Sequence, residues 1–271
     1  RLCFVNKMDR VGASFERTIE SIRRRLNGNP VAIQLPIGAE DQFAGMIDLI
    51  SGMATIYPEG RVNEGNIDRP DEVAMPPQYQ EQYEQYRQEM IEKIAETDDA
   101  LLIKYLEGEE IGQEELQAAL RHATVTQKIV PVICGSAMFA KGVHNLLDCI
   151  LDYLPSPADV PPVEGTAPEG SDYEGTPPPR PADVDGSTTA LAFKVQSSDH
   201  GDLTFVRVYA GRLQSGGKAW NPRTRCMERI GRIQRMHADH GEALEEAVAG
   251  DIAVLVGLKN TVTGDTLCDR A

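Results

Sequence analysis

The residues best suited to chemistry lie near the start of the chain, where a short apolar run passes into Asn6-Lys7-Met8-Asp9. An Asp carboxylate can accept two neighbouring hydrogen bonds, so it fits a ligand edge that carries two N–H donors. Guanine presents such an edge in N1–H and its exocyclic amine, whereas adenine offers no such pair there. The Lys7 stem can lie along the face of a base, and the Asn6 amide can hold the loop together. We therefore predict a loop that selects guanine through Asp9.

A second polar loop, Gly135-Ser136-Ala137, follows another apolar run at residues 128–134. Ligands of parallel α/β sheets bind where buried strands end, and both loops stand at such ends. In a guanine site the backbone N–H of Ala137 can reach guanine O6, and Ser136 can brace the first loop. A bare four-residue motif arises often by chance, but two strand-end motifs of matched chemistry are far less expected. The predicted guanine-binding residues are Asn6, Lys7, Asp9, Ser136 and Ala137.

Phosphate and metal chemistry have no corresponding motif. The sequence holds no G-x-x-x-x-G-K-[ST], and Gly216-Gly217-Lys218-Ala219 lacks both the spacing and the hydroxyl for Mg²⁺. Asp-x-x-Gly occurs three times, once overlapping the Asp9 loop and twice in a proline-rich stretch, and neither context is that of a phosphate-sensing loop. No His shares a metal-like spacing with Cys or with a carboxylate cluster. We therefore predict no catalytic residue and no metal site within this chain.

The composition is that of a soluble globular protein. The chain has 271 residues, 41% of them hydrophobic and 25% charged, which suits one large domain or two ordinary ones. Its 5 Cys are odd in number and widely spaced, without a C-x-x-C pair, which argues against a disulfide framework and a zinc knuckle. No apolar run approaches the roughly 20 residues of a membrane span, and no signal peptide is recognised. A cytoplasmic location without a membrane partner is expected.

The net charge of −15 is distributed unevenly. Residues 187–271 carry 11 Lys and Arg against 10 Asp and Glu, whereas residues 1–186 carry 16 against 32. An acidic surface is repelled by phosphate backbones, so the first part is not expected to bind nucleic acid. The nearly neutral second part could do so through locally placed arginines.

Apolar periodicity indicates an α/β first part. Helices are predicted over residues 14–26, 78–96, 99–106, 113–124 and 141–154, and short strands over 31–50. Ser14 is a suitable N-cap, although Arg17 stands where a capping-box Glu would be. One helical seam recurs at three- and four-residue steps and is expected to face the core. It consists of Tyr79, Tyr83, Tyr86, Met90 and Ile94.

The second part has a different pattern. Residues 155–187 form a predicted extended linker, because residues 155–186 hold nine of the 17 prolines. Beyond it, short alternating segments separated by glycine turns predict a small antiparallel β-barrel. These segments are residues 190–195, 203–209, 218–221, 229–235 and 252–256. The predicted fold class is α/β plus all-β, with a domain over 1–154 and a barrel over 188–271.

Together these strings resemble the elongation factor G family of translational GTPases over nearly the whole chain. Residues 4–10 resemble the guanine loop of the family, and residues 134–137 resemble its second base-contact loop. Residues 34–38 and 43–49 are similar to the entry of an inserted subdomain. Five further segments resemble the second domain of the family, namely residues 201–209, 229–233, 249–252, 257–259 and 263–267.

The resemblance implies the C-terminal half of a P-loop-type GTPase domain, interrupted by an acidic α/β insert over about residues 30–127, and then domain II. It also implies that the phosphate loop, both switches and the catalytic His belong to an earlier part of a longer parent protein. The cofactor would be GTP or GDP, with Mg²⁺ in the intact parent only. We expect the chain alone to bind GTP weakly and to hydrolyse none.

The implied function is that of a ribosomal translocase, which hydrolyses GTP to move tRNA and mRNA during elongation. The insert is implied to meet the ribosomal stalk protein and the barrel to face small-subunit rRNA, with tRNA and mRNA contacted indirectly; a monomer is expected. Two alternatives stay open: a ribosomal-protection or release-type translational GTPase, and a non-enzymatic ribosome-binding module with a vestigial base pocket. The long insert argues against relatives with a compact nucleotide domain. A phosphate-loop motif upstream would separate enzyme from module.

Overall fold

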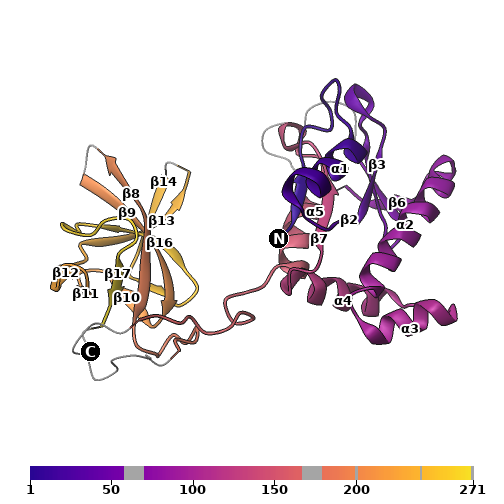
Figure 1. Cartoon of the computed structure of the whole chain (residues 1–271). Helices are drawn as coiled ribbons and strands as arrows, with labels where there is room; N and C mark the ends of the chain where they lie inside the picture. Colours follow the sequence, from indigo (N-terminus) through magenta and orange to yellow (C-terminus); the bar gives the residue numbers. More distant parts are fainter. Residues whose placement is uncertain (58–69, 167–178, 199–200, 239, 270–271) are drawn as a thin grey trace. The chain divides into compact units, whose positions relative to one another are not determined.

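The computed structural model of the chain describes residues 1–57, 70–166, 179–198, 201–238 and 240–269 (Figure 1). The chain divides into two compact units, Arg1–Leu154 and Pro155–Ala271. Each is described separately below. The predicted insert and the predicted linker both include residues outside the described ranges, namely 58–69 and 167–178.

The first unit contains a small parallel sheet that carries both predicted loops. Its strands are β1 (Cys3–Val5), β7 (Val130–Cys134) and β2 (Pro30–Ala32), in the order β1-β7-β2. Both neighbouring pairs are parallel. Helices α1 (Phe15–Leu26) and α5 (Val143–Tyr153) follow the two loops. The predicted N-cap is confirmed, since Ser14 Oγ accepts a hydrogen bond from the Arg17 amide at 3.2 Å.

The insert adds an antiparallel sheet and three helices between β2 and β7. The sheet has the order β3 (Gln34–Ile37), β4 (Gly45–Asp48), β5 (Met53–Ile56) and β6 (Glu72–Ala74). The helices are α2 (Gln80–Ala95), α3 (Asp99–Glu107) and α4 (Gln113–Val125), and the short 3-10 turns are η1 (Glu40–Gln42), η2 (Pro77–Tyr79) and η3 (Ala137–Phe139). The sequence did not predict β5 and β6, because their short segments carry few buried residues.

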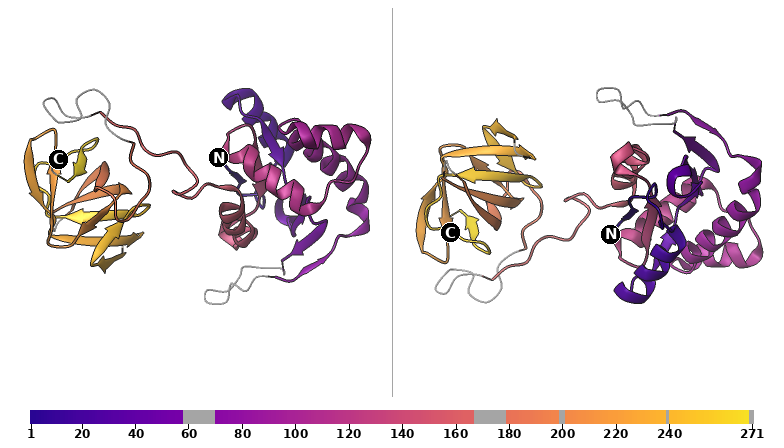
Figure 2. Two further views of the ribbon diagram at one scale, coloured as in Figure 1. Left: turned by 90° about the horizontal axis from the view of Figure 1, so that it is seen from below. Right: turned by 90° about the horizontal axis from the view of Figure 1, so that it is seen from above.

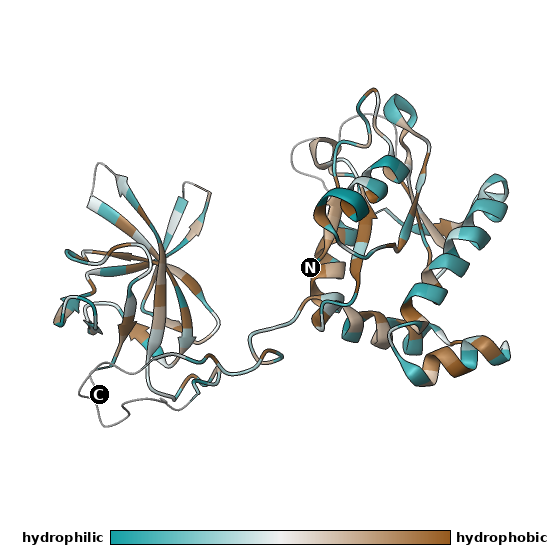
Figure 3. Cartoon of the chain, viewed as in Figure 1, coloured by the Kyte–Doolittle hydropathy of each residue, from teal (hydrophilic) through white to brown (hydrophobic). Residues whose placement is uncertain are grey.

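The aromatic seam packs against the core as predicted. Met90 and Ile94 of α2 are buried, and Tyr79, Tyr83 and Tyr86 are partly buried against the same cluster. Figure 3 shows α2 as largely hydrophilic, so the side that faces the core is narrow. The seam therefore fixes the helix against the sheet without adding a ligand site.

The second unit is built of antiparallel strands. Its elements are β8 (Thr189–Ser198), β9 (Gly201–Ala210), β10 (Arg212–Gln214), β11 (Lys218–Asn221), β12 (Cys226–Arg229), β13 (Arg232–His237), β14 (His240–Leu244), β15 (Glu246–Val248), β16 (Ile252–Val256) and β17 (Thr266–Cys268). Eight strands pair in the order β12-β11-β17-β8-β9-β16-β13-β14, and β10 pairs separately with β15. All described helices belong to the first unit (Figure 2).

The closed barrel predicted from the sequence is not seen. Among the described residues no ladder joins β12 to β14, so the hydrogen-bond order has two open ends. The predicted strand over residues 229–235 is in fact two strands, because the chain leaves β12 at Ile230 and Gly231 and enters β13 near the other end of the order. The sheet must therefore curl strongly, since consecutive residues bring its two ends together.

The proline-rich segment forms no helix or strand in its described part. Val163 and Arg180 make a single antiparallel backbone pair, with both N···O distances at 2.9 Å. No described helix is long and apolar enough to cross a membrane.

Candidate guanine-binding site

The two predicted loops lie side by side because their strands end in register. Val5, the last residue of β1, pairs with Cys134, the last residue of β7. Beyond that point the backbones stay connected: the Gly135 amide donates to Val5 O at 3.0 Å, and the Met8 amide donates to Gly135 O at 3.1 Å. The base loop (residues 6–9) and the closing loop (residues 135–141) thus form one structure at the carboxyl edge of the sheet.

Asn6 holds the two loops together. Its Oδ1 accepts hydrogen bonds from the Lys7 amide at 2.8 Å and from the Ala137 amide at 2.9 Å. Lys7 has φ of 64°, a left-handed conformation that is costly for a residue with a side chain. The hydrogen bond that the Lys7 amide donates to Asn6 Oδ1 stabilises that turn. In this structure the Ala137 amide therefore fixes the base loop, and its contact with guanine O6 stays a prediction.

Two polar atoms at this edge are shielded from solvent and have no hydrogen-bond partner among the described residues. They are Asp9 Oδ1 and Ser136 Oγ. The predicted bracing by the Ser136 side chain is not seen; its backbone instead pairs with Lys141, while the neighbouring residues brace the base loop. A buried carboxylate oxygen without a donor is costly, so this atom suits a ligand that brings N–H groups. The arrangement fits the guanine base.

The closing loop needs a glycine at its first position. A Cβ atom on Gly135 would lie 2.4 Å from Lys141 O and 2.7 Å from the Phe4 ring. Both neighbours belong to the site's own framework, so neither can move away cheaply. This close approach lets the closing loop fold back on itself and lie against β1.

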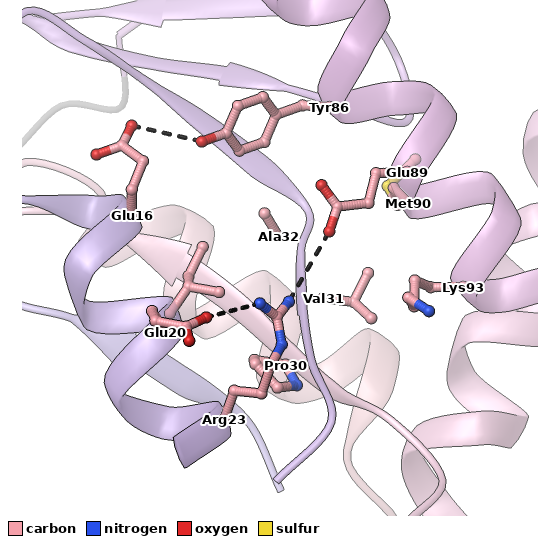
Figure 4. Close-up of a pocket in the computed structure, with 11 residues that line it drawn as sticks. Glu16, Glu20, Arg23, Pro30, Val31, Ala32, Tyr86, Glu89, Met90 and Lys93 are labelled. Carbon is pink, nitrogen blue, oxygen red and sulfur yellow. Dashed lines mark hydrogen bonds and ion pairs between the residues drawn. The ribbon is translucent and has the colours of Figure 1, made fainter. Parts of the chain in front are cut away.

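The described surface also has a groove of about 300 Å³ between α1, β2 and α2 (Figure 4). Arg23 forms ion pairs with Glu20 at 2.8 Å and with Glu89 at 3.9 Å. Tyr86 Oη donates to Glu16 at 3.4 Å, and burial together with that carboxylate raises the pKa of Tyr86 to about 12. Arg23 thus pairs within the groove, Lys93 pairs with Glu96 outside it at 3.1 Å, and no base-loop residue lines the groove. We therefore assign the groove no part in base recognition.

The second unit contains a different acidic cluster, which sequence reasoning missed. Asp265 is only 4% exposed and accepts hydrogen bonds from Arg223 Nε at 2.6 Å, Asn221 Nδ2 at 2.9 Å and the Val262 amide at 2.9 Å. The Arg223 guanidinium is the main cause that lowers the pKa of Asp265 to about 2. No local pattern marks this cluster, because its members come from separate loops.

Glu228 completes the same cluster from β12. It is 3% exposed and accepts hydrogen bonds from the Lys259 amide at 3.0 Å, the Asn260 amide at 2.9 Å and Thr261 Oγ1 at 3.3 Å. Its partners all belong to the segment that connects β16 to β17. Both carboxylates are thus satisfied by the chain itself and hold that segment in place.

The described part of the chain offers no metal site, and two of its cysteines are buried in the core. No group of three or more His, Cys, Asp or Glu side chains is placed there to hold a metal ion. Burial raises the pKa of the Cys134 thiol strongly and that of Cys149 to about 12, so both stay neutral at ordinary pH. They pack as small buried hydrophobes.

Comparisons with known proteins match both parts of the chain. The family model of the elongation factor Tu GTP binding domain matches residues 1–156, and that of elongation factor Tu domain 2 matches residues 201–268. A crystal structure of a protein from Thermus thermophilus is similar over 100% of this chain, with a TM-score of 0.75 and 29% sequence identity.

The chain belongs to the translational GTPase family with an elongation factor Tu-type GTP-binding domain. Its two parts are accordingly a mixed α/β GTP-binding domain and a β-rich domain 2. The chain spans about a third of the length of the Thermus protein, since it covers 36% of that chain.

Proposed function

We propose that this chain is the guanine-selecting part of a longer GTPase that drives tRNA–mRNA translocation on the ribosome, as elongation factor G does. The observation that carries the proposal is Asp9 Oδ1, a buried acceptor without a partner among the described residues, on a loop fixed from both sides. The whole of this chain matches part of a Thermus protein that is almost three times as long, which supports a longer parent.

In this proposal Asp9 accepts the two N–H groups of guanine, and the Lys7 stem covers one face of the base. Asn6 holds the loop, while Ser136 and Ala137 complete the pocket. The Ala137 amide would contact guanine O6 only by sharing its hydrogen with Asn6 Oδ1, to which it now donates. Phosphate binding, Mg²⁺ and hydrolysis are left to other parts of the parent, so the chain alone binds GTP weakly and turns none over.

The proposed ribosomal contacts are those that the family resemblance implies, and the charge distribution supports them. The acidic insert suits a protein partner such as the stalk protein, and the nearly neutral residues 187–271 suit small-subunit rRNA. A ribosomal-protection or release-type GTPase would use the same guanine site. A non-enzymatic module would keep the loop but lack nucleotide turnover in the intact protein.

The test is Asp9→Asn in the intact protein. The amide loses one acceptor and gains a donor, which matches the N1–H and O2 of xanthine instead of guanine. We expect GDP to bind about a hundredfold more weakly and xanthosine diphosphate to bind better than in the unchanged protein. Competition between the two nucleotides, measured by equilibrium binding, gives the answer.

The matched control is Asp41→Asn, an exposed carboxylate of the insert that loses the same charge elsewhere. It should leave guanine preference unchanged. Guanine affinity that survives Asp9→Asn would remove Asp9 from the site, and an unchanged protein that does not distinguish GDP from ADP would overturn the proposal as a whole.

A further inference from the structure

Lys141 connects the closing loop to the insert. Its Nζ donates a hydrogen bond to Phe43 O at 2.7 Å, across 98 positions of sequence. Its backbone pairs with Ser136, with the Ser136 amide 2.9 Å from Lys141 O and the Lys141 amide 3.0 Å from Ser136 O. One residue therefore closes the loop and holds it to a separate segment of the fold.

The acceptor of this bond is firmly placed. Phe43 is 2% exposed and lies in the same core cluster as Met8 of the base loop, which is also 2% exposed. Tyr57 supports the same place, because its Oη accepts a hydrogen bond from the Gly142 amide at 2.8 Å. The insert thus supports the base loop by packing and the closing loop by hydrogen bonds.

The tip of the closing loop has little packing support, although the Ala137 amide donates to Asn6 Oδ1. Ala137 and Met138 are exposed, so packing does not hold the tip of the loop. Its position depends on its two ends, and the Lys141 ammonium provides the charged bond at one of them. Hydrogen bonds with a charged partner are stronger than neutral ones.

We propose that Lys141 is a positioning residue for the guanine site. Its bond to Phe43 O fixes the closing loop, and the closing loop in turn keeps the Ala137 amide against Asn6 Oδ1. This inference rests on the proposed function for its consequence in guanine binding. The mechanical link itself concerns only residues of this chain and can be tested without a nucleotide.

The first test is amide hydrogen exchange on the 271-residue chain, comparing Lys141→Met with Lys141→Arg. Methionine keeps the aliphatic stem but cannot donate, whereas arginine still can. We expect Lys141→Met to lower protection about tenfold at the Met8, Ser136 and Ala137 amides, and Lys141→Arg to retain it. The control is Lys104→Met, which removes the bond from Lys104 Nζ to Glu115 at 2.6 Å within the insert and should leave these amides unchanged.

The second test is the dissociation rate of GDP from the intact protein. Lys141→Met should raise it about tenfold, while Lys141→Arg and Lys104→Met keep the original rate. Unchanged protection at the three amides would overturn the inference, and so would a uniform loss of protection throughout the first unit, because that would show a general structural role. The two proposals can also fail separately. If protection is lost only at these amides but the intact protein does not select guanine, the bond from Lys141 to the closing loop is upheld and the proposed function is not.

Discussion

Each unit has a loop carboxylate with an oxygen shielded from solvent, but the two carboxylates have opposite surroundings. Asp265 in the second unit accepts bonds from a guanidinium, a side-chain amide and a backbone amide. Asp9 in the first unit has a shielded oxygen with no donor among the described residues. An unsatisfied buried acceptor costs free energy, and a ligand that donates hydrogen bonds to it can offset that cost on binding. An acceptor already satisfied by the chain stabilises the fold instead. The contrast supports the proposed ligand site at Asp9 and a structural role for Asp265.

The largest expected effect comes from removing each carboxylate in turn. Asp265→Ala leaves Asn221, Arg223 and the Val262 amide without their acceptor, so the second unit should lose about 3 kcal/mol of unfolding free energy. Asp9→Ala removes a shielded acceptor without a partner, so the first unit should not be destabilised and should gain about 1 kcal/mol of unfolding free energy. Trp220, the only Trp of the chain, lies in β11 and reports on the second unit by fluorescence.

Circular dichroism of the helices reports on the first unit, since all described helices lie there. Urea unfolding followed by both signals therefore measures the two units in one sample. Equal losses of unfolding free energy in Asp265→Ala and Asp9→Ala would contradict the contrast between the two carboxylates.

A smaller effect is expected from acid. The folded pKa of Asp265, about 2, lies below the roughly 3.9 of an unfolded Asp, so folding favours its ionised form. Its contribution is complete above the unfolded pKa and is lost as pH falls from about 4 to about 2. Between those limits the second unit should lose about 1–2 kcal/mol, measured as the free energy of unfolding from Trp220 fluorescence.

Asp265→Asn should remove most of this acid sensitivity, because the amide does not titrate. Asp202→Asn, which replaces an exposed carboxylate of β9, should retain it. An acid response that is the same in both variants would show that other groups control the stability of the second unit at low pH.

Sequence patterns predicted the features that depend on residues close together in the chain. The base loop, its place after a strand and the cap at Ser14 were predictable because each pattern spans only a few positions. The contacts that complete the site were not, because Lys141 and Phe43 are 98 positions apart. The Asp265 cluster joins segments up to 44 positions apart for the same reason. Sheet closure failed as a prediction because it depends on long-range register, which alternation alone does not specify.

The smallest effect concerns two buried hydroxyl groups. Thr261 Oγ1 lies 3.3 Å from Glu228 and 3.5 Å from Asn221, so Thr261→Val should cost the second unit about 1 kcal/mol. Ser136 Oγ has no partner among the described residues, so Ser136→Ala should not destabilise the first unit and should raise its unfolding free energy by up to about 1 kcal/mol. In the intact protein, however, Ser136→Ala should still weaken GDP binding, since the pocket loses a polar group. A destabilised first unit with unchanged GDP affinity would show that Ser136 serves the fold, and the contrast between the two units would then rest on Asp9 alone.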